Sequence, residues 1–193
     1  MRVLLLVLVL VYSHVLRSQD GDFNFGARNN ALAGASSTLG DAWAIYNNVG
    51  GLGNLENSTG MVGYQNRFGL SAFQVVGAAY VQQTSFVNGG ISFYRFGDDL
   101  FNQQQIKLAV ANSIQMVSLG LALDLVQVSI ESLGTTRAAV LEFGGLVTIT
   151  EQLQFSGHAY NINQAQLSGN ETLPTILKAG IAYIPIPTIQ ILG

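Results

Sequence analysis

The sequence predicts an all-β protein, an antiparallel transmembrane β-barrel preceded by a separate N-terminal segment. Three observations predict this fold. The chain of 193 residues is 49% hydrophobic but only 10% charged, far below the roughly 25% typical of soluble domains. Apolar residues alternate with small or polar ones at a period of two, as in residues 117–125. Longer and shorter connections alternate along the chain, which is typical of outer-membrane barrels.

The composition also excludes several classes of protein. The net charge of −3 gives no basic surface for nucleic acid, so no nucleic-acid partner is expected. The absence of cysteine excludes a disulfide framework, a thiolate nucleophile and a zinc–thiolate site. The many Leu, Val, Ile and Phe residues exclude a disordered chain. The exterior must therefore be largely apolar, in contact with membrane lipid or with partners.

Residues 1–18 have the features of a secretory signal peptide. Arg2 gives the segment a positive start, and the apolar run 4–11 that follows is too short for the about 20 residues of a spanning helix. Cleavage is expected after Ser18, with a cut after Ser13 as the alternative. We therefore expect an exported protein of the cell outer membrane.

Residues 19–56 form a segment that lacks strand alternation and is rich in Gly, Ala and Asn. One interpretation is a flexible arm. The other is a plug, or hatch, inside the barrel, because Gly and Ala permit close packing. In a plug, Asn47 and Asn48 would hold a tight turn, Asp41 would cap a short helix directly after it, and Trp43 would fill apolar space. The candidate hatch residues are Asp41, Trp43, Tyr46, Asn47, Asn48, Gly50, Gly51 and Leu52.

Residues 57–193 are predicted to form the barrel. Alternating runs give eight strands and the start of a ninth. They lie at 59–66, 73–82, 89–96, 101–112, 115–131, 137–150, 152–163 and 174–184, with the ninth starting at Thr188. In the fifth run the phase of alternation shifts near Leu125, so a β-bulge is expected there.

The connections are expected to alternate in length. Tight turns are predicted at 113–114, 151 and 185–187, and longer loops between them, such as 132–136 and 164–173. This order of longer and shorter connections places the N-terminus in the periplasm, since periplasmic turns are short and extracellular loops are long.

The same alternation assigns the two faces of each strand, because the apolar face of a membrane barrel meets lipid and the other face lines the lumen. The lipid-facing set is Phe93, Leu108, Val110, Leu119, Leu121, Phe143, Phe155 and Ile181. The lumen-facing set is Lys107, Ser118, Asp124, Glu142, Gln154, His158 and Lys178. Within the lumen, ion pairs of Glu142 with Lys178 or of Asp124 with Lys107 are expected.

No catalytic constellation is visible in the sequence. His158 is the only histidine left once the signal is removed, and a single histidine on a strand is expected to be a hydrogen-bonded wall residue. The spacings HExxH, GxSxG and the P-loop are absent. Asp98 and Asp99 are expected to solvate a turn rather than hold a cation. We expect no enzyme, no metal site and no cofactor.

The N-terminal segment carries a residue pattern that is similar to the signature of a known protein family. It reads Gly26-Ala27-Arg28, Gly34-Ala35, Asp41-Ala42-Trp43 and Tyr46-Asn47-Asn48-Val49-Gly50-Gly51-Leu52. This pattern resembles the N-terminal signature of the FadL-like outer-membrane barrels, and more closely that of the PorV/PorQ-like proteins of Bacteroidetes, which have Pro and Ala where Val49 and Gly50 stand here. The later run Arg95-Phe96-Gly97-Asp98 is similar to the family's loop after an early strand.

The resemblance implies a barrel of about fourteen strands with the N-terminal segment folded inward as a hatch. This chain departs from the pattern at its end, where residues 189–193 lack a terminal aromatic strand. We therefore expect the sequence to be part of a longer reading frame, with a small eight-stranded barrel as the alternative.

Three functions fit this sequence. The first is an outer-membrane barrel that passes or holds hydrophobic small molecules through a plugged lumen, as the resemblance implies. The second is an outer-membrane docking component of type IX protein secretion, with secreted proteins as partners. The third is a soluble secreted β-protein. Transport and docking use the same scaffold, so the sequence does not separate them.

Overall fold

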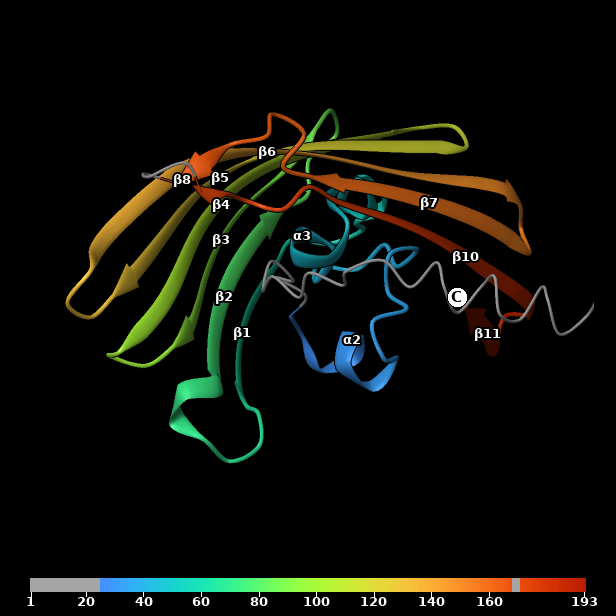
Figure 1. The fold of residues 1–193 in the computed structure, drawn as a ribbon. Helices are drawn as coiled ribbons and strands as arrows, with labels where there is room; N and C mark the ends of the chain where they lie inside the picture. Colours follow the sequence, from blue (N-terminus) through green and yellow to red (C-terminus); the bar gives the residue numbers. More distant parts are fainter. Residues whose placement is uncertain (1–24, 168–170) are drawn as a thin grey trace, which may run out of the picture.

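The computed structural model describes residues 25–167 and 171–193, so the predicted signal peptide lies outside the described residues. The chain forms one antiparallel sheet of nine strands, which arches over a helical N-terminal segment (Figure 1). The predicted all-β, antiparallel class is confirmed. Because the apolar residues alternate at a period of two, each strand has one face toward the N-terminal segment and one face away from it.

The sheet strands match the predicted runs closely, with ends that differ by a few residues. They are β1 (Thr59–Asn66), β2 (Gln74–Gln82), β3 (Asn88–Gly97), β4 (Phe101–Ile114), β5 (Val117–Ile130), β6 (Gly134–Thr150), β7 (Leu153–Tyr160), β10 (Ile176–Ile186) and β11 (Ile189–Leu192). Two short strands, β8 (Gln166–Leu167) and β9 (Glu171–Thr172), form a separate hairpin between β7 and β10.

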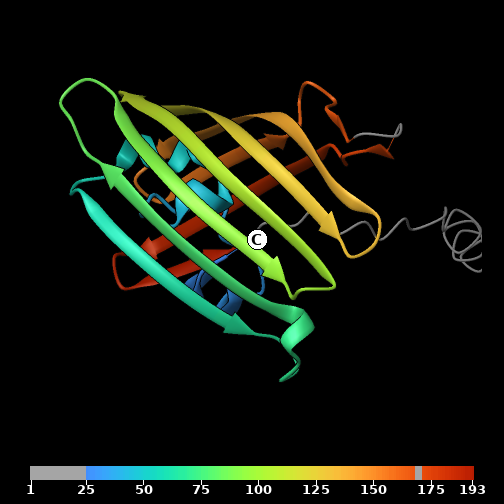
Figure 2. The same cartoon turned by 90° about the vertical axis from the view of Figure 1, so that its left-hand side faces the viewer.

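Neighbours in the chain are neighbours in the sheet, whose order is β1-β2-β3-β4-β5-β6-β7-β10-β11. Figure 2 shows the convex face of the first strands of this up-and-down arrangement, β1 to β6, with the helices behind them. The sheet is not closed, because β1 and β11 pair with one neighbour each. Both edges therefore present backbone groups that the sheet itself does not use.

The bulge predicted in the fifth strand is wrong. The register between β4 and β5 runs without a break from Phe101 opposite Ile130 to Ile114 opposite Val117. The shift of alternation has another cause: Val126 is buried on the concave face, so the inner face of β5 itself becomes apolar there. The described register irregularities lie elsewhere, at the end of β6 and at the end of β10.

The connections follow the predicted alternation of length only in part, because 83–87 is longer than 98–100, which comes after it. At one end of the sheet they are 67–73, 98–100, 131–133 and 161–175, and each of these is longer than the turn that follows it. Those turns, at the other end, are 83–87, 115–116, 151–152 and 187–188. The turn predicted at 113–114 lies inside β4, and the chain reverses at 115–116 because Gln115 adopts a left-handed conformation with φ of 56°.

The N-terminal segment lies on the concave side of the sheet (Figure 1). Its short helices are α2 (Ala27–Ala31), α3 (Ala44–Asn47) and the 3-10 helix η1 (Val49–Asn54), and a further 3-10 helix, η2 (Ser71–Phe73), lies between β1 and β2. The hydrophobic core forms where α3 and η1 meet the inner strand faces. None of the described helices has the length and apolar character needed to cross a membrane.

Candidate functional site

The concave face of the sheet holds the charged side chains that the alternation assigns to the inside. Lys107, Asp124, Glu142 and His158 lie on four adjacent strands, β4 to β7, and each side chain is at most 6% exposed. Lys178 on β10 is half-buried and lies directly opposite His158 in the register. All five residues therefore point to the concave side, with four of them fully enclosed.

Three of these charges form one tight cluster. The Lys107 ammonium donates to both carboxylate oxygens of Glu142 at 2.8 Å, and it lies 3.8 Å from the Asp124 carboxylate. The His158 Nε2 atom lies 3.2 Å from the same Glu142 carboxylate. The expected approach of Asp124 to Lys107 is therefore present, but Glu142 holds the lysine more closely. In a buried cluster the Coulomb attraction must offset the cost of removing each charge from water.

The cluster presents hydrogen-bonding atoms that the described protein does not use. Both carboxylate oxygens of Asp124 and both amide atoms of Gln105 are buried without a hydrogen bond of good geometry among the described residues, although Asp124 lies close enough to Gln105 and Glu142 to interact with both. Buried polar atoms of this kind are nearly always satisfied in native proteins, by protein or by water. This part of the inner wall is therefore suited to polar groups or water, and Gln105 was missed by the sequence analysis.

Toward the end with the longer connections, the inner face becomes more apolar, although Gln103 and Gln105 also lie buried there. Its buried side chains are Val75, Tyr94, Val126, Val128, Ala138, Val140 and Tyr160, and Leu167 of β8 covers them from the connection 161–175. Asn161 organises this connection, because its side chain accepts from Ala165 N–H at 2.7 Å and donates to the Leu173 carbonyl at 2.8 Å. The sequence signal for Asn161 is weak, since only its tolerance of a positive φ, here 57°, distinguishes it.

Glycines allow η1 to lie directly on the backbone of β5 and β6. A methyl group added to Gly50 would come within 2.6 Å of the Gly144 and Gly145 backbone, and one added to Gly120 would overlap the Val49 carbonyl. Such contacts are closer than any side chain with a β-carbon permits. The glycines of β5 and β6 and those of the predicted hatch therefore allow the backbone of η1 to pack directly against the backbone of the two strands.

Asn48 connects this contact to two other segments. Its carboxamide oxygen accepts from Gly50 N–H at 3.1 Å, and its amide nitrogen donates to the carbonyls of Ser37 and Gly145 at 2.7 and 3.2 Å. The side chain is completely buried, and it caps η1. Asn47 is buried as well, but its side-chain oxygen has no partner among the described residues. Of the two adjacent asparagines, Asn48 therefore holds the turn.

Tyr46 and Leu52 contact the strands on the other side of the segment. The Tyr46 hydroxyl lies 2.7 Å from the Ala78 carbonyl and 2.8 Å from the Phe93 carbonyl, so it donates to the backbone of β2 or β3. Burial raises the pKa of this hydroxyl, which keeps it protonated as a donor. Asn88 at the start of β3 donates to the Leu52 carbonyl at 2.8 Å.

Asp41 and Trp43 lie at the rim of the segment. The Asp41 carboxylate accepts from Trp43 N–H at 3.0 Å and pairs with Arg28 at the same distance, but α3 begins at Ala44, so the expected helix start directly after Asp41 is wrong. Trp43 is half-buried and packs edge-on against Phe25, with ring centroids 5.6 Å apart. Phe25, which the sequence analysis missed, fills the hollow over the paired Gly63 and Gly77.

The turn between β3 and β4 uses its two acids locally. Asp98 accepts from the backbone N–H groups of Leu100 and Phe101, and Asp99 lies 3.8 Å from Arg95. Within residues 25–167 and 171–193, no group of three or more His, Cys, Asp or Glu side chains is arranged so that it could hold a metal ion. Comparisons of the chain with protein-family models, with curated proteins and with solved structures found no match.

Proposed function

We propose that this protein is an outer-membrane β-barrel protein of the PorV/PorQ/FadL-like type, which passes or holds hydrophobic molecules through a lumen plugged by its N-terminal segment. In this proposal the convex face of the sheet meets lipid, and the concave face is the lumen wall. Residues 25–56 are the plug, and the apolar part of the inner wall is the surface for a hydrophobic ligand.

The observation that carries the proposal is the inverted polarity of the sheet. On the concave face a lysine, two carboxylates and a histidine are buried, whereas large apolar side chains cover the convex face. The large apolar residues on the outer face of β5 alone include Val117, Leu119, Leu121, Leu123 and Leu125, each between 37% and 58% exposed. A soluble sheet has the opposite arrangement, since an extended exposed apolar surface favours association in water. Lipid is the environment in which such a surface is stable.

The open edges support a larger barrel. Strands that span a bilayer must belong to a closed barrel, because lipid satisfies no backbone hydrogen bond. The unpaired edges of β1 and β11 are compatible with further strands, as in a barrel of about fourteen. The proposal therefore includes strands that connect these two edges.

A docking role in protein secretion is the second candidate, and the connection 161–175 favours it. This connection is the longest at its end of the sheet, and it contains its own hairpin, β8–β9. Asn161 bonds to Ala165 and Leu173, so it holds together the described arms of the connection, residues 161–167 and 171–175. A secreted partner protein would meet this connection rather than the plug.

The test is an arginine placed on the convex face. Leu121→Arg lies in the middle of the outer face, and we expect it to lower the free energy of unfolding in bilayers or micelles by roughly 2–4 kcal/mol. Leu133→Arg is the matched control, because Leu133 is also exposed but lies in the turn between β5 and β6. The control should change stability by less than about 0.5 kcal/mol.

The same pair of substitutions distinguishes the proposed membrane protein from a soluble β-protein. If the convex face met water, both leucines would be exposed to solvent and both substitutions would be tolerated equally. Equal effects, together with protein that stays in solution without detergent, would contradict the proposal and favour a soluble β-protein.

A further inference from the structure

The convex face has a sharp boundary between polar and apolar side chains. One outward row across β3 to β6 consists of direct register partners, namely Arg95, Gln104, Gln127 and Arg137. The neighbouring outward row, toward the shorter turns, consists of Phe93, Ile106, Leu125 and Ala139. Amide and guanidinium groups therefore give way to hydrocarbon from one row to the next. In the proposed membrane orientation, such a boundary corresponds to the headgroup level of a bilayer.

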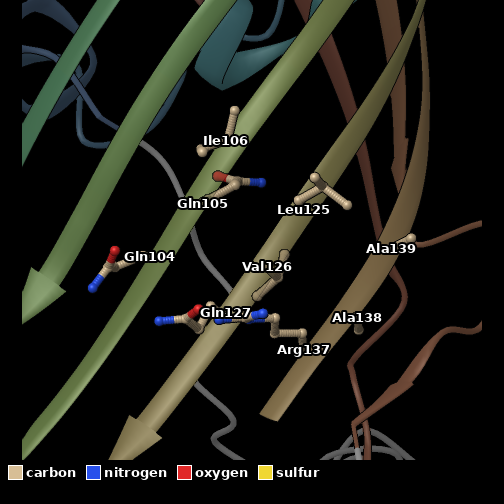
Figure 3. A pocket seen from close by; sticks show the side chains of 9 residues that line it. All are labelled: Gln104, Gln105, Ile106, Leu125, Val126, Gln127, Arg137, Ala138 and Ala139. Atoms are coloured by element: carbon tan, nitrogen blue, oxygen red, sulfur yellow. Dashed lines mark hydrogen bonds between the residues drawn. The ribbon is translucent and has the colours of Figure 1, made fainter. Parts of the chain in front are cut away.

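A hollow of about 420 Å³ lies across this boundary on β4, β5 and β6 (Figure 3). Gln104, Gln127 and Arg137 line one side of it, and Ile106, Leu125 and Ala139 line the other. The small side chain of Ala139 beside Leu125 leaves the space open. The volume falls within the about 300–1,000 Å³ of small-molecule sites, and its two sides match an amphiphile rather than a uniformly apolar ligand.

Arg137 brings an uncompensated positive charge to this hollow. Its Nε atom donates to the Gln127 side-chain oxygen at 2.7 Å, which orients the guanidinium group beside the outer surface. No carboxylate in the described parts of the chain forms an ion pair with it, whereas Arg95 in the same row lies 3.8 Å from Asp99. The remaining N–H groups of Arg137 form a planar fork, which suits the oxygens of a phosphate.

We propose that this hollow binds an anionic lipid, whose phosphate pairs with Arg137 and whose acyl chain lies on Ile106, Leu125 and Ala139. The inference rests on the proposed function, because it places the convex face in a bilayer. Gln104 and Gln127 would hydrogen-bond the ester and glycerol oxygens between the two parts. A free phosphate would leave the apolar side unused, and the ammonium group of a zwitterionic lipid would weaken the pairing with Arg137.

The experiment compares two lipids of equal chain length on the detergent-solubilised protein. Phosphatidylglycerol or phosphatidylcholine is titrated in, and the retained lipid is counted by native mass spectrometry. We expect the unmodified protein to retain phosphatidylglycerol about fivefold more tightly, which corresponds to one arginine near an anionic headgroup. Arg137→Gln should abolish this preference, and Arg137→Lys, which keeps the charge, should retain part of it.

Two controls isolate the hollow. Arg67→Gln removes the same charge from the connection between β1 and β2, outside the hollow, and should leave the preference unchanged. Ala139→Leu fills the apolar side and should lower the retention of both lipids. Ala179→Leu, on the exposed outer face of β10, makes the same change elsewhere and should not lower it.

Several outcomes would overturn the inference. These are equal retention of the two lipids by the unmodified protein, an undiminished preference in Arg137→Gln, or displacement of phosphatidylglycerol by inorganic phosphate at millimolar concentration. Failure of the proposed function would look different, because the protein would then be soluble without detergent and would retain neither lipid.

Discussion

At the scale of single residues, glycines determine where the N-terminal segment touches the sheet. Gly50 lies against the backbone of Gly144 and Gly145, with no room for a β-carbon. We expect Gly50→Ala to lower the free energy of unfolding by about 1–3 kcal/mol, because backbone on both sides must move. Gly157→Ala is the control, since nothing lies within 4 Å of its added methyl group, and it should leave stability unchanged. Chemical denaturation of both variants in detergent measures the difference.

The two adjacent asparagines provide a second comparison. Asn48 makes three hydrogen bonds through its side chain, whereas the Asn47 side-chain oxygen has no partner among the described residues. Asn48→Ala would leave the buried N–H of Gly50 without its acceptor and the Ser37 and Gly145 carbonyls without this donor, so we expect a loss of about 2–3 kcal/mol and faster proteolysis near Gly50. Asn47→Ala should cost less and leave the cleavage rate nearly unchanged. The reverse order would show that the turn is held in another way.

The buried ion cluster gives a third prediction. Lys107→Met would leave the buried carboxylate of Glu142 without its cation, so we expect the free energy of unfolding to fall by about 3–5 kcal/mol. The double variant Lys107→Met/Glu142→Gln also removes the charge of this carboxylate and should be more stable than Lys107→Met alone. A double-mutant cycle with Glu142→Gln measures this coupling, and strictly additive effects would contradict the pairing.

At the scale of strands and helices, the period of two was enough to find nine strands, because the pleat of a strand sends successive side chains to opposite faces. It did not reveal what each face meets. The shift near Leu125 indicated a bulge, yet β5 is regular, and the shift arises because Val126 and Val128 belong to an apolar part of the inner wall. The alternation of a single strand does not contain this information, since it depends on the residues across the interior.

The placement of the N-terminal segment can be tested at this same scale. Ser37 and Ser156 are 119 positions apart in sequence, yet their hydroxyl oxygens lie 2.8 Å apart between the segment and β7. The chain has no cysteine, so Ser37→Cys/Ser156→Cys should form a single disulfide under mild oxidation. Ser37→Cys/Ser129→Cys is the control and should stay reduced. Absence of the first crosslink, seen as unchanged mobility on a non-reducing gel, would mean that the segment does not lie against β7.

At the scale of the whole molecule, the sequence was sufficient for the fold class and insufficient for the interior. The low content of charged residues and the strand periodicity indicate an apolar exterior. Both can be recognised in the sequence without knowing which residues meet in the fold. The contacts of the candidate site are long-range, such as that of Asn48 with Gly145, 97 residues away. Phe25, Gln105 and Asn161 were missed for the same reason, because no local pattern marks them.

In the proposed orientation, the convex face of the sheet meets lipid while the concave face is enclosed. Single cysteines placed in turn along β5 (Val117–Ile130) can carry a spin label, because the chain has no cysteine of its own. In bilayers, we expect labels at 119, 121, 123 and 125 to be accessible to lipid-soluble oxygen and shielded from a water-soluble nickel complex. Labels at the inward positions 122 and 128 should be shielded from both. High accessibility of the odd-numbered positions to the nickel complex would contradict this orientation.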